Sequence, residues 1–130
     1  MSSPSDLKYT KSHEWVRVEG DIATIGITDH AQEELGDITY LELPDVGESL
    51  SAAEAFGVVE SVKAASDINS PFDGEIIERN ESAVEAPEVV NTSPYGDAWL
   101  LKVRLDNPAQ IDSLLSPKEY DELLEQEAGH

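Results

Sequence analysis

The stretch 57–71, GVVESVKAASDINSP, constrains the fold most, because its pattern predicts a short β-hairpin with a lysine at its tip. The valines before Lys63 favour a strand, and the small and polar residues that follow it favour a tight reversal. Ile68 resumes the apolar pattern, and Ser70-Pro71 ends it. A lone exposed lysine is usually only a solvated charge, so the significance of Lys63 depends on the sequence around it.

A short quasi-repeat surrounds this hairpin. The segment PDVGE at 44–48 recurs as PFDGE at 71–75, an offset of 27 residues (71 − 44), and Glu54 and Glu81 keep the same offset. Two copies are too few for a solenoid, which needs at least about three repeats. They fit two matching halves of one small sheet domain, each opening with a Pro/Gly turn. Lys63 then lies on the connection between the halves.

Apolar and alternating patterns predict that much of the remaining chain is β-structure. One short helix is expected after Thr28-Asp29, whose side-chain oxygens can cap it, and Gly36 is expected to end it. Strands are expected over 14–18, 22–27, 38–43, from the turn at Gly74 onward, and over 99–105.

The C-terminal part of the chain is predicted to change from strand to helix. Residues 81–94 contain two prolines and indicate an ordered but largely irregular connection. Trp99 is expected in the core, since tryptophan side chains are mostly buried. Two helices are expected after the last strand, beginning at 107–108 and 116–117, with apolar stripes suited to packing against the sheet.

The composition excludes several classes of function. At 130 residues the chain is long enough for a modest core, and we expect a single domain over 1–130 whose core covers about 7–126. The formal net charge of −20 disfavours a nucleic-acid partner, because a phosphate backbone repels an acidic surface. No apolar run approaches the roughly 18 residues of a membrane-spanning helix, so no membrane association is expected.

Catalytic and metal-binding motifs are missing from the sequence. The chain has no cysteine, which excludes disulfides and thiolate chemistry of its own. The three histidines, His13, His30 and His130, share no metal-ligand spacing, so no metal is expected. No nucleotide-binding or hydrolase motif appears either. Any sulfur redox chemistry would therefore have to be supplied by an attached cofactor.

The motif ESVKAASDINSP around Lys63 closely resembles the lipoyl-attachment motif of the glycine cleavage system H-protein family. Further stretches look like that family in the same order: SHEW at 12–15, IGITDHA at 25–31, LP at 43–44, PYG at 94–96 and WL at 99–100. The resemblance covers about residues 7–126. It implies a mainly β fold, a barrel-sandwich hybrid of the lipoyl/biotinyl type with two quasi-equivalent sheets, one short internal helix and C-terminal helices.

The resemblance also implies a carrier rather than an enzyme. Lipoate would be joined to Lys63 through an amide, one lipoyl group per chain. The arm would carry an aminomethyl group from the glycine decarboxylase (P protein) to the aminomethyltransferase (T protein). The dihydrolipoyl dehydrogenase (L protein) would then reoxidise it. A lipoate-attaching enzyme is a further implied partner, and the carrier is expected to be a monomer.

An aminomethyl group held away from water would need oxygen acceptors for its amine. Ser12 and Glu14, in the family-like SHEW stretch, and Asp67, beside the hairpin tip, are the candidates. The simpler interpretation is that Ser12 caps a turn and that both carboxylates are solvated.

Other uses of a single lysine fit less well. Biotin carriers usually present methionines around it, and lipoyl domains of 2-oxoacid dehydrogenases usually have an acidic residue directly before it, whereas Val62 and Ala64 flank Lys63. A Schiff-base enzyme would need a buried lysine in a sizeable pocket, which a hairpin of small residues does not suggest. An H-like protein that mainly relays lipoyl groups between other proteins stays an open alternative. Asn69 is one local departure, at a position where many relatives have an aromatic residue.

The N-terminal residues MSSPSD have neither an apolar signal core nor an arginine-rich transit pattern. We therefore expect a soluble protein of the bacterial cytoplasm, with a mature form in the mitochondrial matrix as the alternative.

Overall fold

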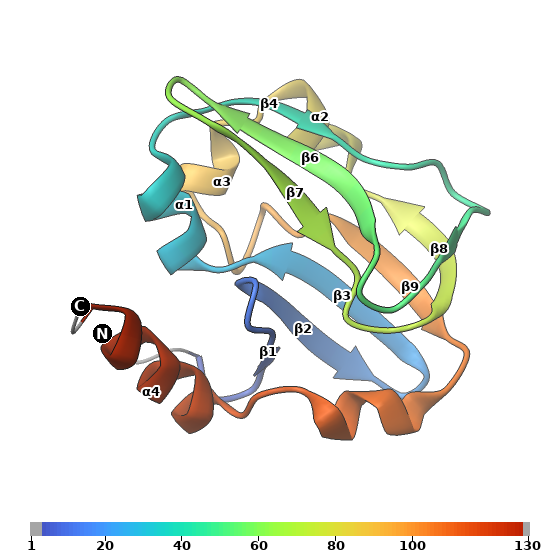
Figure 1. Cartoon of the computed structure of the whole chain (residues 1–130). Helices are drawn as coiled ribbons and strands as arrows, with labels where there is room; N and C mark the ends of the chain where they lie inside the picture. Colours follow the sequence, from blue (N-terminus) through green and yellow to red (C-terminus); the bar gives the residue numbers. More distant parts are fainter. Residues whose placement is uncertain (1–3, 129–130) are drawn as a thin grey trace.

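The computed structural model describes residues 4–128, which form two antiparallel sheets with short helices around them (Figure 1). The strands are β1 (Lys8–Tyr9), β2 (Glu14–Glu19), β3 (Ile22–Ile27), β4 (Ile38–Glu42), β5 (Ser49–Leu50), β6 (Ala55–Ser61), β7 (Ala65–Asn69), β8 (Gly74–Arg79) and β9 (Leu101–Leu105). The helices are α1 (Asp29–Leu35), α2 (Glu81–Glu85), α3 (Val89–Thr92), the 3-10 helix η1 (Pro108–Ser113) and α4 (Pro117–Ala128).

The larger sheet has six strands in the order β1-β2-β3-β9-β8-β5, and the smaller has three in the order β4-β6-β7. Each strand presents alternate side chains to its two faces, and the apolar faces of the two sheets meet in one core. Ile25, Ile76 and Val103 come to it from the larger sheet, and Val59 and Ile68 from the smaller one. The expected mainly β architecture of two sheets is confirmed.

The two copies of the quasi-repeat lie side by side. β5 follows the first copy and pairs with β8, which begins inside the second, in the register Ser49↔Glu75. Gly47 N–H donates to the Ile76 carbonyl at 2.8 Å, and Ile76 N–H donates to the Glu48 carbonyl at 2.9 Å. The β6–β7 hairpin is the connection between the copies, as the repeat predicted.

A second apolar cluster attaches the C-terminal helix. Tyr9 of β1 and Tyr120 of α4 are fully buried, and their rings stack with centroids 4.6 Å apart. Trp15 is also fully buried in this cluster, and its indole N–H donates to the Pro94 carbonyl at 2.9 Å. Stacked, buried rings of this size fix the position of α4 against the N-terminal strands.

Two expectations for the C-terminal half were wrong in detail. Residues 81–94 contain helices α2 and α3 rather than irregular chain, because Asn80 caps α2 through Ala83 N–H and both Ala83 and Val90 are buried. The last strand begins at Leu101, after Trp99. Trp99 is only partly buried and packs at the edge of the second cluster, so the fully buried tryptophan is Trp15.

The close approach of Trp15 to Gly26 generates a stability prediction. A Cβ at Gly26 would overlap the Trp15 indole, which is buried and cannot swing away. We expect Gly26→Ala to lower the free energy of unfolding in urea by about 2 kcal/mol, the usual cost of overpacking. Gly20→Asn is the control, because nothing lies within 4 Å of a Cβ there and asparagine tolerates a left-handed backbone. Equal stability of Gly26→Ala and the unmodified chain would contradict this packing.

Candidate functional site

The tip of the β6–β7 hairpin is a tight turn held by one serine. β6 and β7 pair up to Glu60↔Ala65, and Ser61 N–H donates to the Ala64 carbonyl at 2.8 Å. The Ser61 hydroxyl accepts the Ala64 N–H at 3.1 Å and the Lys63 N–H at 3.4 Å. Val62 N–H donates to the Asp37 carbonyl at 3.1 Å, which ties the tip to the segment after α1. The turn therefore has a defined shape despite its exposure.

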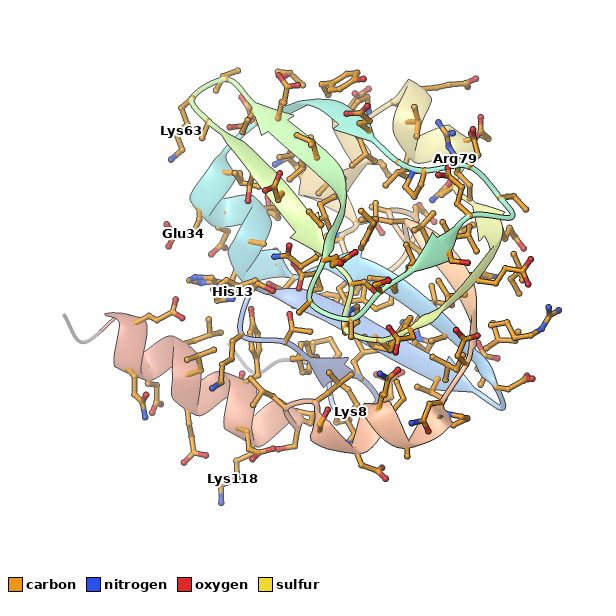
Figure 2. All side chains as sticks on the ribbon, turned by 45° about the vertical axis from the view of Figure 1, so that its right-hand side comes forward. Lys8, His13, Glu34, Lys63, Arg79 and Lys118 are labelled. Atoms are coloured by element: carbon orange, nitrogen blue, oxygen red, sulfur yellow. The ribbon has the colours of Figure 1, made fainter. Side chains whose placement is uncertain are left out.

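Lys63 projects from this turn into solvent. Its side chain is exposed, and Figure 2 shows it at the hairpin tip on the same side of the molecule as Glu34 and His13. Its Cε lies beside the end of α1, 3.7 Å from where a Cβ on Gly36 would be. Within residues 4–128 its amino group makes no ion pair, so the nitrogen is accessible to a modifying enzyme.

A hollow of about 420 Å³ lies on this side of the molecule. The turn between β1 and β2, helix α1, strand β7 and the end of α4 enclose it. Ser66 on β7, which lines the hollow, is three residues after Lys63 in the sequence. Its lining residues are Ser12, His13, His30, Ala31, Glu34, Leu35, Ser66 and Glu127.

Ser12 and Glu14 form one hydrogen-bonded unit at the wall of this hollow. Glu14 is only 2% exposed, and its Oε1 accepts the hydroxyls of Thr10 and Ser12, each at 2.6 Å. Its Oε2 accepts the Asn69 backbone N–H at 3.3 Å, from β7. A buried carboxylate needs such donors. The simpler interpretation of Glu14 as a solvated carboxylate is therefore wrong.

Asp67 lies apart from this unit. It is exposed on β7, next in sequence to Ser66, and adjacent strand residues point to opposite faces. Ser66 lines the hollow that contains Ser12, whereas Asp67 lines a second hollow of about 430 Å³ with residues of β4 and β6. The structure therefore brings together two of the three predicted amine-binding residues and separates the third.

Comparisons with known proteins agree with this geometry. The glycine cleavage H-protein family model matches residues 7–127. The chain is 55% identical over 124 residues to the glycine cleavage system H protein of Carboxydothermus hydrogenoformans, covering 95% of each. It is 59% identical over 124 residues to that of Rubrobacter xylanophilus, covering 95% of this chain and 96% of the relative.

The chain belongs to the glycine cleavage H-protein family. A mitochondrial H protein of Flaveria trinervia is 55% identical over 123 residues, which is 95% of this chain and 74% of the relative. The crystal structure of an H protein from Mycobacterium marinum superposes with a TM-score of 0.86 at 39% identity, covering 98% of this chain and all of that one. The resemblance seen in the sequence is confirmed, with its fold and its function in the glycine cleavage system.

H proteins serve that system as lipoyl carriers rather than as catalysts, and the role implied by the sequence is confirmed at the level of the family. The relatives of this chain include both bacterial and mitochondrial proteins. Among residues 4–128, no helix is long and apolar enough to cross a membrane.

Sequence reasoning missed one feature of this site, a cluster of two imidazoles and a carboxylate. His13, His30 and Glu127 come from the β1–β2 turn, α1 and α4, and no spacing in the sequence relates them. The two imidazole centroids are 4.7 Å apart. Burial lowers the pKa of His13 below its ordinary value. His130 lies outside the described residues.

The three donors to Glu14 generate a second stability prediction. Glu14→Ala would leave the Thr10 hydroxyl and the Asn69 N–H without this acceptor in a largely buried place. We expect the free energy of unfolding to fall by about 2 kcal/mol, as for other buried groups that lose a partner. Glu19→Ala, at the exposed end of β2, is the matched control and should change it by less than about 0.5 kcal/mol. Similar losses for the two variants in urea unfolding would contradict the assigned hydrogen bonds.

Proposed function

We propose that Lys63 is the residue that carries the lipoyl group, one per chain. The family membership and the motif around Lys63 support this site. So does the geometry of the tip, where Lys63 and the flanking Val62 and Ala64 are all exposed. A ligase cleft can reach such a turn, because the Lys63 side chain is exposed at its tip.

A lipoyl group on Lys63 would form a long side-chain arm that ends in a sulfur-containing ring. Amide formation would remove the ammonium charge of Lys63 and supply a dithiolane that exchanges with thiols. The rigid turn fixes the root of the arm, so the reactive end stays at high effective concentration wherever the carrier docks. The hollow beside α1 begins at Ser66, within reach of an arm rooted at Lys63. One domain over residues 1–130 suffices for this role.

The amine of the carried aminomethyl group would be received by Ser12 and Glu14. The Ser12 hydroxyl faces the hollow and donates to the Glu14 carboxylate at 2.6 Å, so its lone pairs remain able to accept from an ammonium. The negative charge behind it strengthens that hydrogen bond. Asp67 stays a prediction, and its place in the second hollow does not support it.

The partners we propose are the P, T and L proteins and a lipoate-attaching enzyme. The net charge of −20 suits electrostatic steering to basic surfaces on each of them. We further propose that the carrier acts as a monomer, without nucleic acid or membrane. Its compartment would be the bacterial cytoplasm, with the mitochondrial matrix as the alternative. H proteins of both kinds are among the relatives of this chain, at 59% identity for a bacterial one and 55% for a mitochondrial one.

The attachment site is tested by intact mass. Coexpression of the full chain with a lipoate ligase and lipoate should add one lipoyl group to the protein and to the control Lys118→Arg, an exposed lysine on α4. Lys63→Arg should gain none, because its guanidinium cannot be acylated by the ligase. An unmodified wild-type chain, or a lipoylated Lys63→Arg chain, would reject the proposal.

Reconstitution then separates a glycine cleavage carrier from a relay of lipoyl groups. The lipoylated chain, mixed with P, T and L proteins, should support release of CO₂ from glycine in the presence of tetrahydrofolate and NAD. The Lys63→Arg chain should support none. A chain that passes lipoyl groups to other proteins but supports no glycine decarboxylation would be the relay.

The amine site is tested by the lifetime of the loaded carrier. We expect Glu14→Ala to shorten the lifetime of the aminomethyl form while leaving lipoylation intact, since Glu14 does not contact the hairpin tip. Glu14→Gln keeps the side-chain volume and separates the loss of charge from the loss of stability, and Glu19→Ala serves as control. Decay is followed by mass spectrometry at a temperature where every variant is folded. An unchanged lifetime in Glu14→Ala would reject the role.

A further inference from the structure

Three side chains from distant parts of the chain bring their ligand atoms together at the rim of the hollow. One ligand atom from each of His13, His30 and Glu127 lies within 4.8 Å of the other two. Glu127 Oε1 is 3.4 Å from His13 Nε2 and 3.9 Å from His30 Nε2. Within residues 4–128 this is the only such group of histidine and carboxylate ligands. Nothing in the carrier role requires it.

These distances are close to those of a metal site. Around a tetrahedral zinc ion with bonds of about 2.0–2.1 Å to nitrogen and oxygen, neighbouring ligand atoms lie about 3.3–3.5 Å apart. The His13–Glu127 pair already has this spacing, and the His30–Glu127 pair has to close by about half an ångström. The ligand nitrogens of the two histidines lie within 4.8 Å of each other and have to approach by at most about 1.5 Å, which a rotation of the half-buried His30 ring can supply. Two imidazoles and one carboxylate are also the protein ligands of catalytic zinc sites, which keep a fourth position open.

A second layer of hydrogen bonds orients one of the imidazoles. His13 Nδ1 is 2.8 Å from the Tyr120 hydroxyl, which is 2.7 Å from the Thr28 hydroxyl. With the proton on Nδ1, His13 donates to Tyr120, and the lone pair of Nε2 faces Glu127. Histidine ligands of metals are held in this way by a partner on their other nitrogen. Tyr120 is itself fixed by its stacking on Tyr9.

The backbone of His13 is unusual for a residue with a side chain. Its φ is 71°, in the left-handed region that glycine adopts without cost. The imidazole of this residue lies against that of His30 on the first turn of α1, with the ring centroids 4.7 Å apart.

We propose that His13, His30 and Glu127 bind one Zn²⁺ ion, with the fourth coordination position open to the hollow. The ion would join the β1–β2 turn, α1 and α4, three elements that are otherwise joined by apolar packing and single hydrogen bonds. The site uses only side chains of this chain and does not depend on lipoylation of Lys63.

Zinc titration of the full chain, made without lipoate, tests the site. His130→Gln is the background for every protein, so that His13 and His30 are the only imidazoles present. A chromogenic chelator competes for the metal. We expect one zinc per chain in the background protein, and a loss of affinity of at least about tenfold in His13→Gln, His30→Gln and Glu127→Gln. Zinc should also raise the midpoint of thermal unfolding, because it binds only the folded chain.

Two controls separate a built site from general binding to an acidic surface. Glu125→Gln makes the same change of charge on α4 and should keep the affinity of the background protein. Glu34→Gln removes the ion pair that Glu34 makes with His30 at 3.7 Å. This variant should also bind zinc with the affinity of the background protein. The ring-proton NMR signals of His13 and His30 should shift with one equivalent of zinc.

Three results of these titrations would overturn the zinc site. It is overturned when the triple variant His13→Gln/His30→Gln/Glu127→Gln binds zinc as tightly as the background protein, or when neither binds it. It is also overturned when Glu125→Gln loses as much affinity as Glu127→Gln. If His13→Gln does not fold, as judged by circular dichroism, the exposed or half-buried variants Glu127→Gln and His30→Gln decide the question.

Discussion

The burial of two apolar sheet faces against each other is the constraint on which the rest of the structure depends. The β6–β7 hairpin is anchored in this shared core through Val59 and Ile68, which are both buried. Burial of such side chains is worth about 1.5–3 kcal/mol each. Toward the tip the apolar contacts stop and Lys63 is exposed. An anchored base and an exposed tip are what a carrier needs to present one amino group to several enzymes.

A polar unit complements this apolar core on the side of the hollow. Glu14 is as buried as many core residues, yet it is satisfied by Thr10, Ser12 and the backbone of β7. It therefore links β2 of the larger sheet to β7 of the smaller one. The Tyr9–Tyr120 stack then holds α4 beside the same hollow. This stack places Glu127 near two histidines from the other end of the chain.

Local patterns predicted the local elements well. The cap of α1 is as expected, with the Thr28 hydroxyl accepting the Ala31 N–H at 3.2 Å and Gly36 ending the helix. The hairpin around Lys63 formed because valines and small turn residues stand side by side in sequence. The connection over 81–94 was misjudged, because the burial of Ala83 and Val90 stabilises short helices that the prolines of this segment did not suggest. Tertiary packing overrode the local signal there.

The sequence by itself determined the family, the strand pattern and the lysine at the hairpin tip, because each is carried by residues adjacent in the chain. Only the tertiary structure decided that Glu14 is buried, that Asp67 faces a different hollow from Ser12, and that His13 and His30 meet Glu127. The physical reason is distance along the chain. These relations depend on the strand face a side chain takes and on the docking of α4 against β1, and neither is encoded by spacing within a motif.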